Sequence, residues 1–538
     1  MRLMMNAKAL FLAGGLVLIS SDVTFAGALK APPGLFKDLH DEILDDAIIL
    51  NGKQLFIDNH IIGQLDGVNK RLNQPTKHAR NPLLIKDKAW EDSGPGYGTV
   101  LYDADEGIFK MWYGFWIADA RPSEQVLCYA TSKDGLHWIK PIVNEDEGTN
   151  AVDTPDIKGF QSAGIMKDPV ERDPARRYKM LFSAAPDGTP RSWLTSAAFS
   201  HDGIHWRASD PVALIPFSDT QICPYWDPRR GRYVAIIRYG PPNSRLVDRI
   251  ESEDFLHWSP KVRVINRTRL DQPLSTVFYQ MAPMPYEGVT VGLIAAYHSE
   301  TLAEPPEGKP WVDRKNLHLA FSRNGVTWSR VGRHGAIPQR ELSQDKDWKQ
   351  IALGAAFVPY GRKSVDWDWG TVSPYFTPDP IVVGDRIFFY YIAQNGRNWW
   401  THAGDPPKLD PDAVAPTKGV GLATLRLDGF VSVEGQGTLT TRTLLFIGDQ
   451  IEVNADASGG SIRVEAVDPN GDVIEGFARQ DCAPITTDSV RHVLQWNDNP
   501  DCHLLQARPI KLRFHLNKAK LYSFTPRIRH THFVPSYD

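Results

Sequence analysis

Net charge, cysteine and long apolar runs are all scarce in this chain. Its 538 residues carry a formal net charge of only −4 and include four cysteines. A faintly acidic chain shows no excess of basic residues that would suggest nucleic-acid binding, so we expect no nucleic-acid partner. Beyond the N-terminus no apolar stretch is long enough to cross a bilayer, so we expect no membrane span. Aromatic residues are plentiful, with 16 tryptophans, which is enough for a large core, and the chain is too long for one compact domain.

The first 26 residues have the pattern of a cleavable signal peptide. Arg2 and Lys8 precede an apolar run over residues 9–19, and a small-x-small site at residues 24–26 follows without a lipid-attachment cysteine. This pattern predicts cleavage before Gly27 and a secreted or periplasmic protein.

Export would permit disulfides, which makes the spacing of the few cysteines informative. Cys482 and Cys502 lie close together in the C-terminal region, and we expect them to pair. Cys128 and Cys223 belong to separate repeat units and are expected to be buried thiols.

One short phrase recurs along the chain at irregular spacing. It reads TSKDGLHW, FSHDGIHW, ESEDFLHW and FSRNGVTW, ending at Trp138, Trp206, Trp258 and Trp328, and a more divergent LRLDGFVS surrounds Gly429. A β-rich run such as YKMLFSA or YVAIIRY precedes each copy, and a shorter strand with a tight turn precedes that run. Five copies therefore predict five units, each of four antiparallel strands.

Five such units predict an all-β protein with a five-bladed β-propeller over residues 82–434. A β-sandwich with coincidental Asp-Gly turns is the alternative, but it does not explain the constant order within the units. Residues 435–538 alternate in shorter strands without the phrase, which predicts a small C-terminal β-sandwich. Residues 27–81 form an N-terminal extension that contains a strand at 55–62, and this strand either caps the propeller or bridges to the sandwich.

The order of strands within a unit also predicts where binding residues lie. If the first strand of each unit lines the central channel, the tight turns share one face and the long loops share the other. Long loops on a rigid scaffold commonly carry binding residues, so we expect the site on the long-loop face. Carboxylates in the tight turns are then expected to cap those turns, namely Asp168, Asp173, Asp227 and Glu287, as are the repeat aspartates Asp134, Asp202 and Asp254.

The remaining acids stand just before the innermost strands, where several of them would converge on the axis. Such convergence raises pKa values by like-charge repulsion, and glycoside cleavage needs one protonated and one ionised carboxyl group. The candidates are Glu91, Asp92, Asp153, Asp156, Asp219, Asp271, Asp366 and Asp368. By position we predict Asp92, Asp219 and Asp368 as the catalytic acids, with Glu91 as the nearest substitute.

The long loops and strand ends add aromatic, arginine and histidine side chains. Aromatic faces stack on sugars, and arginine can grip a carboxylate or sulfate. We predict substrate binding by Trp116, Arg191, Tyr279, His298, Arg397 and Trp399, with Arg121, Trp193, Tyr239, Trp311, Trp400 and His402 nearby. We expect no cofactor and no metal in the site.

Several of these motifs resemble those of a known group of enzymes. The matching segments are WExxxxxxGTVLYD, KMWY, YATSKDGxHW, RYKMLF, WDPRRGxYVA, WDxG and GLATLRLDGFVS. They resemble the five-bladed propeller glycosidases of the arabinanase, xylosidase, invertase and levansucrase superfamily, and are most similar to a secreted bacterial branch described only as glycosyl hydrolases. The resemblance covers nearly the whole mature chain and is more specific for the fold than for the activity.

The resemblance implies three site carboxylates: an aspartate base or nucleophile from the first blade, an aspartate from the second and a glutamate acid from the third. The chain departs from this pattern, because it has no WMNDPNG-like start and no third-blade glutamate before an innermost strand. The ERDP segment at Asp173 imitates an invertase motif but lies in a tight turn.

From these observations we expect a secreted glycoside hydrolase that acts on a glycan by carboxylate acid/base catalysis. A carbohydrate-binding propeller without activity is the first alternative. A glycoside phosphorylase is a less favoured one, because export separates the reaction from the cell interior, where the sugar phosphate would be used.

Overall fold

The structure is a computed structural model in which strands dominate. It describes residues 11–12, 15–16, 47–50, 52–91, 93–117, 124–155, 157–189, 193–209, 218–239, 245–267, 271, 276–298, 314–331, 356–362, 365–396 and 418–528. Within these ranges the chain is all-β, apart from the short 3-10 helices η1 (Pro174–Arg176) and η4 (His503–Leu505). A search of the same ranges finds no helix long and apolar enough to cross a membrane.

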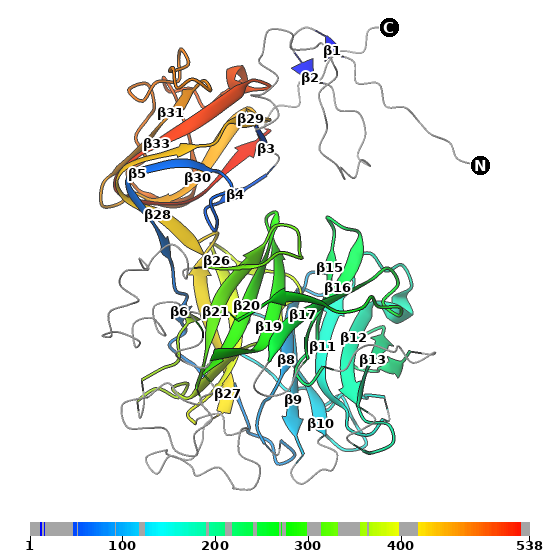
Figure 1. The fold of residues 1–538 in the computed structure, drawn as a ribbon. Helices are drawn as coiled ribbons and strands as arrows, with labels where there is room; N and C mark the ends of the chain where they lie inside the picture. Colours follow the sequence, from blue (N-terminus) through cyan, green and yellow to red (C-terminus); the bar gives the residue numbers. More distant parts are fainter. Residues whose placement is uncertain are drawn as a thin grey trace, which may run out of the picture.

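The strands form two lobes, which Figure 1 shows one above the other. In the larger lobe, successive antiparallel groups follow the order of the chain. The first group is β8 (Gly98–Asp103), β9 (Ile108–Trp116) and β10 (Gln125–Ser132); the second is β11 (Gln161–Lys167), β12 (Tyr178–Ala184), β13 (Leu194–Ser200) and β14 (Arg207–Ala208); the third is β15 (Cys223–Asp227), β16 (Arg232–Tyr239), β17 (Leu246–Ser252) and β18 (Val262–Ile265).

The fourth and fifth groups share one sheet. The fourth is β19 (Thr276–Tyr286), β20 (Val289–His298), β21 (Arg314–Ser322), β22 (Ser329–Arg330) and β23 (Ala356–Val358); the fifth is β24 (Thr371–Pro374), β25 (Ile381–Val383), β26 (Arg386–Gln394) and β27 (Lys418–Arg426). A parallel pairing of Lys315 with Thr371 joins the two groups.

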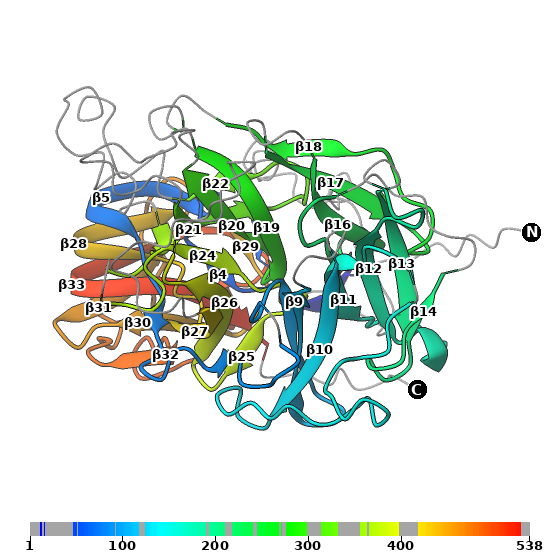
Figure 2. The same ribbon diagram turned by 90° about the horizontal axis from the view of Figure 1, so that it is seen from below.

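The first strands of the five groups pack against one another in sequence around a common centre. β8 contacts β11, and the contacts continue from β11 to β15, β19 and β24. Between the first and fifth groups, Val100 N–H donates to the Phe376 carbonyl at 2.9 Å and Phe376 N–H donates to the Gly98 carbonyl at 3.0 Å. Seen from below in Figure 2, the groups lie around this centre.

Residues from the N-terminal side complete the fifth group. β6 (Thr76–Lys77) and β7 (Leu84–Ile85) both pair antiparallel with β27. After β27 the chain leaves for the second lobe, so the outer edge of this group is covered by residues that precede the first group. Backbone N–H and C=O groups that would otherwise form an exposed edge are paired in this way.

The recurring Asp-Gly turns have the same internal hydrogen bonds in each copy. Asp134 Oδ1 accepts the backbone N–H groups of Leu136 and His137, each at 2.8 Å. Asp202 and Asp254 make the equivalent bonds in the second and third groups. The prediction that these aspartates form turns is therefore confirmed, and their carboxylates are occupied by backbone donors.

Two of these turns also receive a side chain from the preceding group. Trp112 in β9 donates its indole N–H to the Gly203 carbonyl at 2.6 Å, and Tyr390 in β26 donates its hydroxyl to the Gly135 carbonyl at 2.7 Å. Both glycines have positive φ, +83° and +73° respectively. A Cβ atom on Gly203 would lie 2.6 Å from Trp112, so both the backbone conformation and the close approach require glycine.

A pair of glycine substitutions separates these two requirements. A Cβ atom on Gly107, where φ is +68°, would meet nothing within 4 Å, whereas one on Gly203 would meet the indole. Gly107→Ala should cost only the strain of positive φ, about 1–2 kcal/mol. Gly203→Ala should cost roughly 1–3 kcal/mol more, from overpacking. Denaturant unfolding measures both, and equal losses would contradict the docking of Trp112.

The second lobe is a sheet network organised around one long strand. Its members are β3 (Ile48–Leu50), β4 (Gln54–Leu55), β5 (Ile62–Leu72), β28 (Val431–Thr441), β29 (Leu444–Phe446), β30 (Gln450–Asp456), β31 (Ser461–Val467), β32 (Asp488–Val493) and β33 (Pro509–Arg527). β33 pairs directly with β4, β28, β29, β30 and β31, and the inward side chains of the lobe form one hydrophobic core. The small strands β1 (Phe11–Leu12) and β2 (Gly15–Leu16) pair with each other.

The predicted strand at residues 55–62 is wrong in detail. β4 ends at Leu55 and β5 begins at Ile62, and both belong to the second lobe. Between them the Asp58 carboxylate accepts the backbone N–H of His60 at 3.0 Å and binds Arg323 of the larger lobe. A side chain that bonds its own backbone favours a turn over an extended strand, which explains the break.

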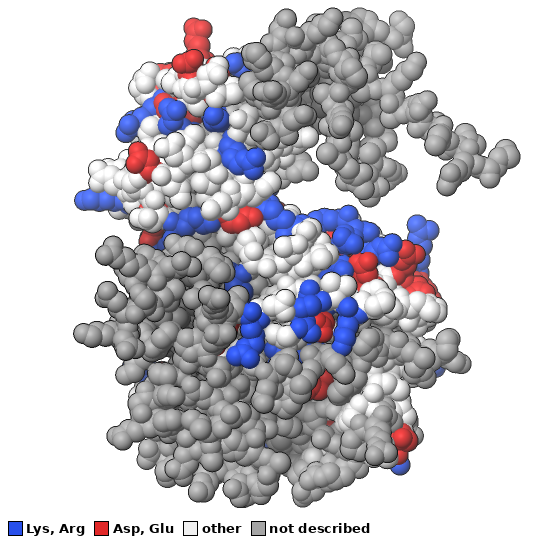
Figure 3. All heavy atoms as spheres, viewed as in Figure 1, with Lys and Arg blue, Asp and Glu red and all other residues white. Residues whose placement is uncertain are grey.

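A buried aspartate joins the two lobes. Asp428 accepts hydrogen bonds from Tyr286 at 2.6 Å and from Ser523 at 2.7 Å, and it forms an ion pair with Lys53 at 3.0 Å. Lys53 also pairs with Glu287 at 2.9 Å, in the tight turn between β19 and β20. Figure 3 shows acidic and basic side chains intermixed along this junction. The second lobe therefore packs against the tight-turn side of the larger lobe.

The predicted disulfide does not form. All four cysteines are buried free thiols, including Cys482 and Cys502. The Cys482 sulfur accepts the Val464 N–H and donates to the Ala483 carbonyl at 3.4 Å, so it faces β31. Cys502 precedes η4, and burial raises the pKa of its thiol to about 12. Proximity in sequence did not bring the two sulfur atoms together.

Thiol titration tests this arrangement. The denatured, unreduced protein should release four thiols, and the folded protein should react slowly because burial suppresses the thiolate. A value of two thiols after denaturation would contradict the structure and restore the predicted bridge.

Candidate functional site

The long-loop face is the end of the larger lobe from which the first strands begin. On this face Asp219, just before β15, binds the guanidinium of Arg238 near the end of β16, with Nε to Oδ1 at 2.7 Å. The Asp219 side chain is 42% exposed, whereas Arg238 is 2% exposed. Asp219 is thus held by a buried cation while part of its carboxylate remains open to solvent.

Two tyrosines adjoin this ion pair. The Tyr279 ring lies against Arg238, with 4.5 Å between the guanidinium carbon and the ring centre. Tyr97, directly before β8, has its hydroxyl 3.2 Å from that of Thr220. Burial raises the pKa of Tyr97, and the neighbouring Tyr279 raises it further, so its hydroxyl stays protonated and can donate a hydrogen bond.

A bulge in β19 sets the position of Tyr279. The pairing of β19 with β20 shifts register between Phe278 and Gln280, which leaves Tyr279 as the extra residue. A β-bulge commonly re-aims a side chain at a functional site. A second bulge, between Gln161 and Gly164, holds Ser162 at φ +60° at the same end of β11, the first strand of the second group.

Amide side chains tie the first strands together below these residues. Gln280 donates to Gln221 Oε1 at 2.9 Å, and Gln221 donates to the carbonyls of Gly98 and Ala163, both at 2.9 Å. These bonds connect the first four groups around the centre. The residues on the long-loop face therefore rest on a hydrogen-bonded, rigid base, as precise positioning requires.

Further cations surround Tyr279. Arg245, just before β17, lies 5.1 Å from the ring centre, and the Lys315 ammonium of β21 lies 4.2 Å from it. Lys418, the first residue of β27, is close enough that its charge lowers the pKa of Lys315. We call Arg238, Arg245, Lys315 and Lys418 the cationic cluster.

Of the predicted catalytic acids, Asp219 binds Arg238 of this cluster, and Asp92 falls outside the described residues. Glu91 is 1% exposed, and its carboxylate binds Lys140 at 2.6 Å and the Tyr113 hydroxyl at 2.6 Å. It also accepts the backbone N–H groups of Asp87 and Lys88. With so many donors bound, Glu91 anchors residues 87–91 and has no acceptor position directed to a ligand.

Asp368 is likewise buried and paired. It is 1% exposed, forms an ion pair with Lys77 of β6 at 2.6 Å and accepts from the Tyr391 hydroxyl at 3.1 Å. No hydrogen bond or ion pair between described residues joins it to Asp219. These contacts fasten the N-terminal β6 to the fifth group, so we assign Asp368 a structural role.

Neighbouring aspartates test this assignment. Asp368→Asn should destabilise the protein by roughly 1–3 kcal/mol, because it removes a charge that the Lys77 ammonium requires. Asp366→Asn, in the same segment, should change stability little, because its partner Arg362 is 77% exposed and screened by solvent. Thermal unfolding compares the two, and loss of activity without loss of stability in Asp368→Asn would instead place Asp368 in the site.

The other acids before first strands divide in the same way. Asp271 is fully buried and binds Arg330 through both oxygens, at 2.8 and 2.7 Å. Asp153 is exposed, and its backbone forms an isolated parallel β-bridge with that of His205. Asp156 lies outside the described residues. The predicted turn caps Asp168, Asp173 and Asp227 are confirmed, since each accepts backbone N–H groups within its turn. Glu287 binds Lys53 instead.

Three of the six predicted binding residues can be placed. Trp116 is half-buried at the end of β9, Tyr279 lies within the cationic cluster, and His298 is buried at the end of β20, 2.9 Å from the Thr276 hydroxyl. Trp193 is half-buried just before β13. The other predicted binding residues lie outside the described residues, namely Arg191, Arg397 and Trp399. The same holds for the residues expected nearby: Arg121, the Tyr239 side chain, Trp311, Trp400 and His402.

Sequence reasoning missed the cationic cluster. It searched for carboxylates and aromatic residues, and so passed over Arg238 at the end of YVAIIRY and Lys315 in the RKNLHLAF run. Their shared signal is a basic residue at the long-loop end of a second or third strand. The two faces were already assigned from the sequence, so this signal could have been found there.

One exposed group within the described ranges has metal-ligand composition. His201, Asp202 and His205 bring their ligand atoms within 4.8 Å of one another. However, the same His–Asp pair recurs in the other repeat turns, as His137 with Asp134 at 2.6 Å and His257 with Asp254 at 2.6 Å. The pair therefore stabilises the turn, and we assign no metal to it.

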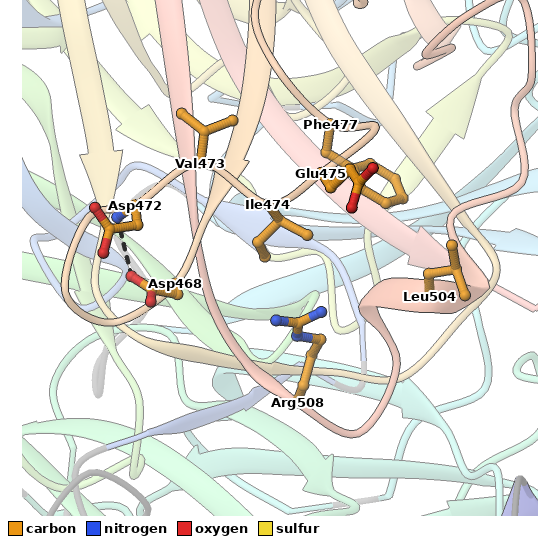
Figure 4. Close-up of a pocket in the computed structure, with 8 residues that line it drawn as sticks. All are labelled: Asp468, Asp472, Val473, Ile474, Glu475, Phe477, Leu504 and Arg508. Atoms are coloured by element: carbon orange, nitrogen blue, oxygen red, sulfur yellow. Dashed lines mark hydrogen bonds between the residues drawn. The ribbon is translucent and has the colours of Figure 1, made fainter.

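Two hollows lie away from the long-loop face. One, of about 430 Å³, lies in the second lobe between Asp468, Glu475, Phe477 and Arg508 (Figure 4), where Asp468 accepts the Asp472 backbone N–H at 3.0 Å. The other, of about 450 Å³, lies at the junction and is lined by Arg229, Tyr286, Glu287 and Arg491 among others.

Comparison with known proteins gives fold neighbours only. No family model and no curated protein matches the chain. Solved structures that it resembles include an N-acetylgalactosamine deacetylase from F. plautii (14% identity, TM-score 0.42, covering 68% of this chain and 97% of that one). A family-32 β-fructofuranosidase from Bombyx mori (12%, 0.37, 85% and 95%) and a thermostable family-43 glycoside hydrolase (13%, 0.37, 65% and 94%) are also similar.

The neighbours of families 43, 32 and 130 are propeller glycosidases, the group that the sequence motifs resemble. Their identities are 11–14% and their TM-scores 0.37–0.42, and we draw no conclusion about this chain from them.

Proposed function

We propose that this protein is a glycan-acting enzyme, built as a five-bladed β-propeller with a β-sandwich and exported by its N-terminal signal peptide. The observation that carries the proposal is Asp219. It is the one predicted catalytic acid in the described residues whose carboxylate is both anchored, by buried Arg238, and open to solvent on the long-loop face. The other placed candidates, Glu91 and Asp368, are enclosed by their own cations.

The reaction that fits best is hydrolysis of a glycosidic bond. Such hydrolysis needs a carboxylate base or nucleophile on one side of the bond and a protonated acid on the other. Asp219, held by Arg238, suits the first role, since a fixed carboxylate loses little freedom when it acts. For its partner we propose Asp92, which directly follows the anchored Glu91 in the sequence.

Side chains on the same face as Asp219 would bind and orient the sugar. Tyr97 offers a hydroxyl donor, and half-buried Trp116 offers an aromatic face on which sugar C–H groups stack. Binding energy from such contacts is what holds the bond to be cleaved against the catalytic acids. The same residues would also serve a propeller that only binds carbohydrate, so activity must be measured directly.

The test is a release assay on a broad panel of plant and algal glycans with matched aspartate variants. With a cleaved glycan identified, Asp219→Asn should lower turnover by roughly 10²–10⁴-fold with the fold intact. The control is Asp173→Asn on the tight-turn side, where the carboxylate accepts the Ala175 N–H in a turn, and its effect should fall on stability rather than turnover.

The other outcomes separate the alternatives. Near-normal turnover in Asp219→Asn would remove this residue from the mechanism. Tight glycan binding without any product, in wild type and variants alike, would establish a binding propeller. Release that requires inorganic phosphate and yields a sugar phosphate would establish a phosphorylase.

A further inference from the structure

The cationic cluster holds more positive charge than its surroundings neutralise. Among the described residues Asp219 is the only carboxylate that pairs with any member, and it pairs with Arg238. No hydrogen bond or ion pair from the described residues reaches the ammonium group of Lys315 or Lys418. In Arg245, which is 6% exposed, the buried Nε and Nη1 atoms have no acceptor among them.

Other buried charges of the larger lobe show the opposite arrangement. Glu91 pairs with Lys140, Asp271 pairs with Arg330, and Lys179 pairs with both Asp168 and Glu171. A buried charge without a partner costs several kcal/mol, so folded proteins seldom keep one without a use for it. Here two buried cations without a carboxylate partner among the described residues, Arg245 and Lys315, lie against the same tyrosine ring, and the charge of Lys418 acts on Lys315.

The pKa values of the two lysines reflect this cost of burial. Burial, together with the charges of Lys418, Arg245 and Arg238, lowers the pKa of Lys315 to about 7. Burial also lowers the pKa of Lys418, to about 8. The Tyr279 ring offsets part of this cost through cation–π contact. An anion among these groups would favour the protonated ammonium forms and restore the missing hydrogen bonds.

We propose that the cationic cluster binds an anionic group carried by the glycan substrate, the carboxylate of a uronic acid or a sulfate ester. This assignment rests on the proposed glycan-acting function and adds the class of substrate. The guanidinium of Arg245 and the ammonium of Lys315 both lie against the Tyr279 ring, so together they present two positive charges to an oxyanion at that position. Asp219 binds Arg238, itself a member of the cluster, so the anion would sit close to the bond that is cleaved.

The experiment compares ligands that differ only in charge. The probes are galacturonate oligosaccharides with their methyl-esterified counterparts, sulfated galactan oligosaccharides with their desulfated counterparts, and inorganic phosphate alone. Titration calorimetry on the wild type should show one charged glycan binding about 10–100-fold more tightly than its neutral counterpart, as hydrogen bonds to a charged group predict. Whether the uronate or the sulfate pair shows the difference identifies the anion.

Matched variants then test whether the cluster causes the higher affinity for the charged glycan. Lys315→Met and Arg245→Met should each remove most of the charged-to-neutral affinity ratio. Lys133→Met, an exposed lysine in a repeat turn of the opposite face, should leave the ratio unchanged. Equal affinity for charged and neutral glycans in the wild type would overturn the proposal. An affinity ratio that survives in both cluster variants would also overturn it, as would a protein that binds inorganic phosphate but neither charged glycan.

Stability gives a check that does not depend on binding. Because the pKa of Lys315 is about 7 in the folded protein and near 10.5 otherwise, the unfolded state takes up more protons between these values. The unfolding free energy of the wild type should therefore rise with pH over this window. The charged and titratable groups that face Lys315 there are Lys418, Arg245, Arg238 and Tyr279. Lys315→Met should flatten that rise and raise the melting temperature at pH 7, which excludes misfolding as the cause of lost discrimination.

The two proposals can fail separately. Cleavage of neutral glycans with no preference for charge would leave the proposed function in place and overturn the anion site. Charge-dependent binding that the cluster variants abolish, without cleavage of any glycan, would support the anion site and overturn the enzymatic function.

Discussion

The larger lobe depends on the contact between a side chain of one strand group and the turn of the next. Trp112 reaches Gly203, Tyr286 reaches Asp428, and Tyr390 of the fifth group reaches Gly135 of the first. Because the last contact returns to the beginning of the series, the fifth group is joined to the first. The Asp-Gly turn serves this contact well, since its glycine has no side chain to block the incoming ring.

This packing occupies the tight-turn face of the larger lobe. On the tight-turn side, carboxylates accept backbone N–H groups, and Glu287 and Asp428 share Lys53 at the junction with the second lobe. Acids on that side are therefore engaged within the protein itself. On the long-loop side, Asp219 keeps a solvent-exposed carboxylate above a base of hydrogen-bonded amides.

The same division explains the uneven distribution of charge. Buried acids such as Glu91 and Asp368 contribute to stability because each has a cation in direct contact. Arg245 and Lys315 have no such partner among the described residues, and their burial works against stability. Binding sites commonly retain groups of this kind, since the energy lost in the empty protein is recovered when the ligand supplies the opposite charge.

The sequence by itself determined the all-β class, the order of the repeat units and the role of the turn aspartates. Asp134 and its equivalents were predictable because each turn is encoded within a few consecutive residues, whose hydrogen bonds are local. The strand run before each phrase was equally readable from its β-rich composition. The place of Asp219, before an innermost strand, was also readable from the sequence, and its catalytic role stays a prediction.

Only the tertiary structure decided which charged groups meet. Lys77 could be matched to Asp368, and Cys482 separated from Cys502, only after the N-terminal strands were placed on β27 and the second lobe was folded. The cationic cluster gathers Arg238, Lys315 and other basic residues far apart in the chain around one tyrosine. The physical reason is that the partner of a buried charge is set by long-range strand packing, which leaves no trace in the local sequence around either residue.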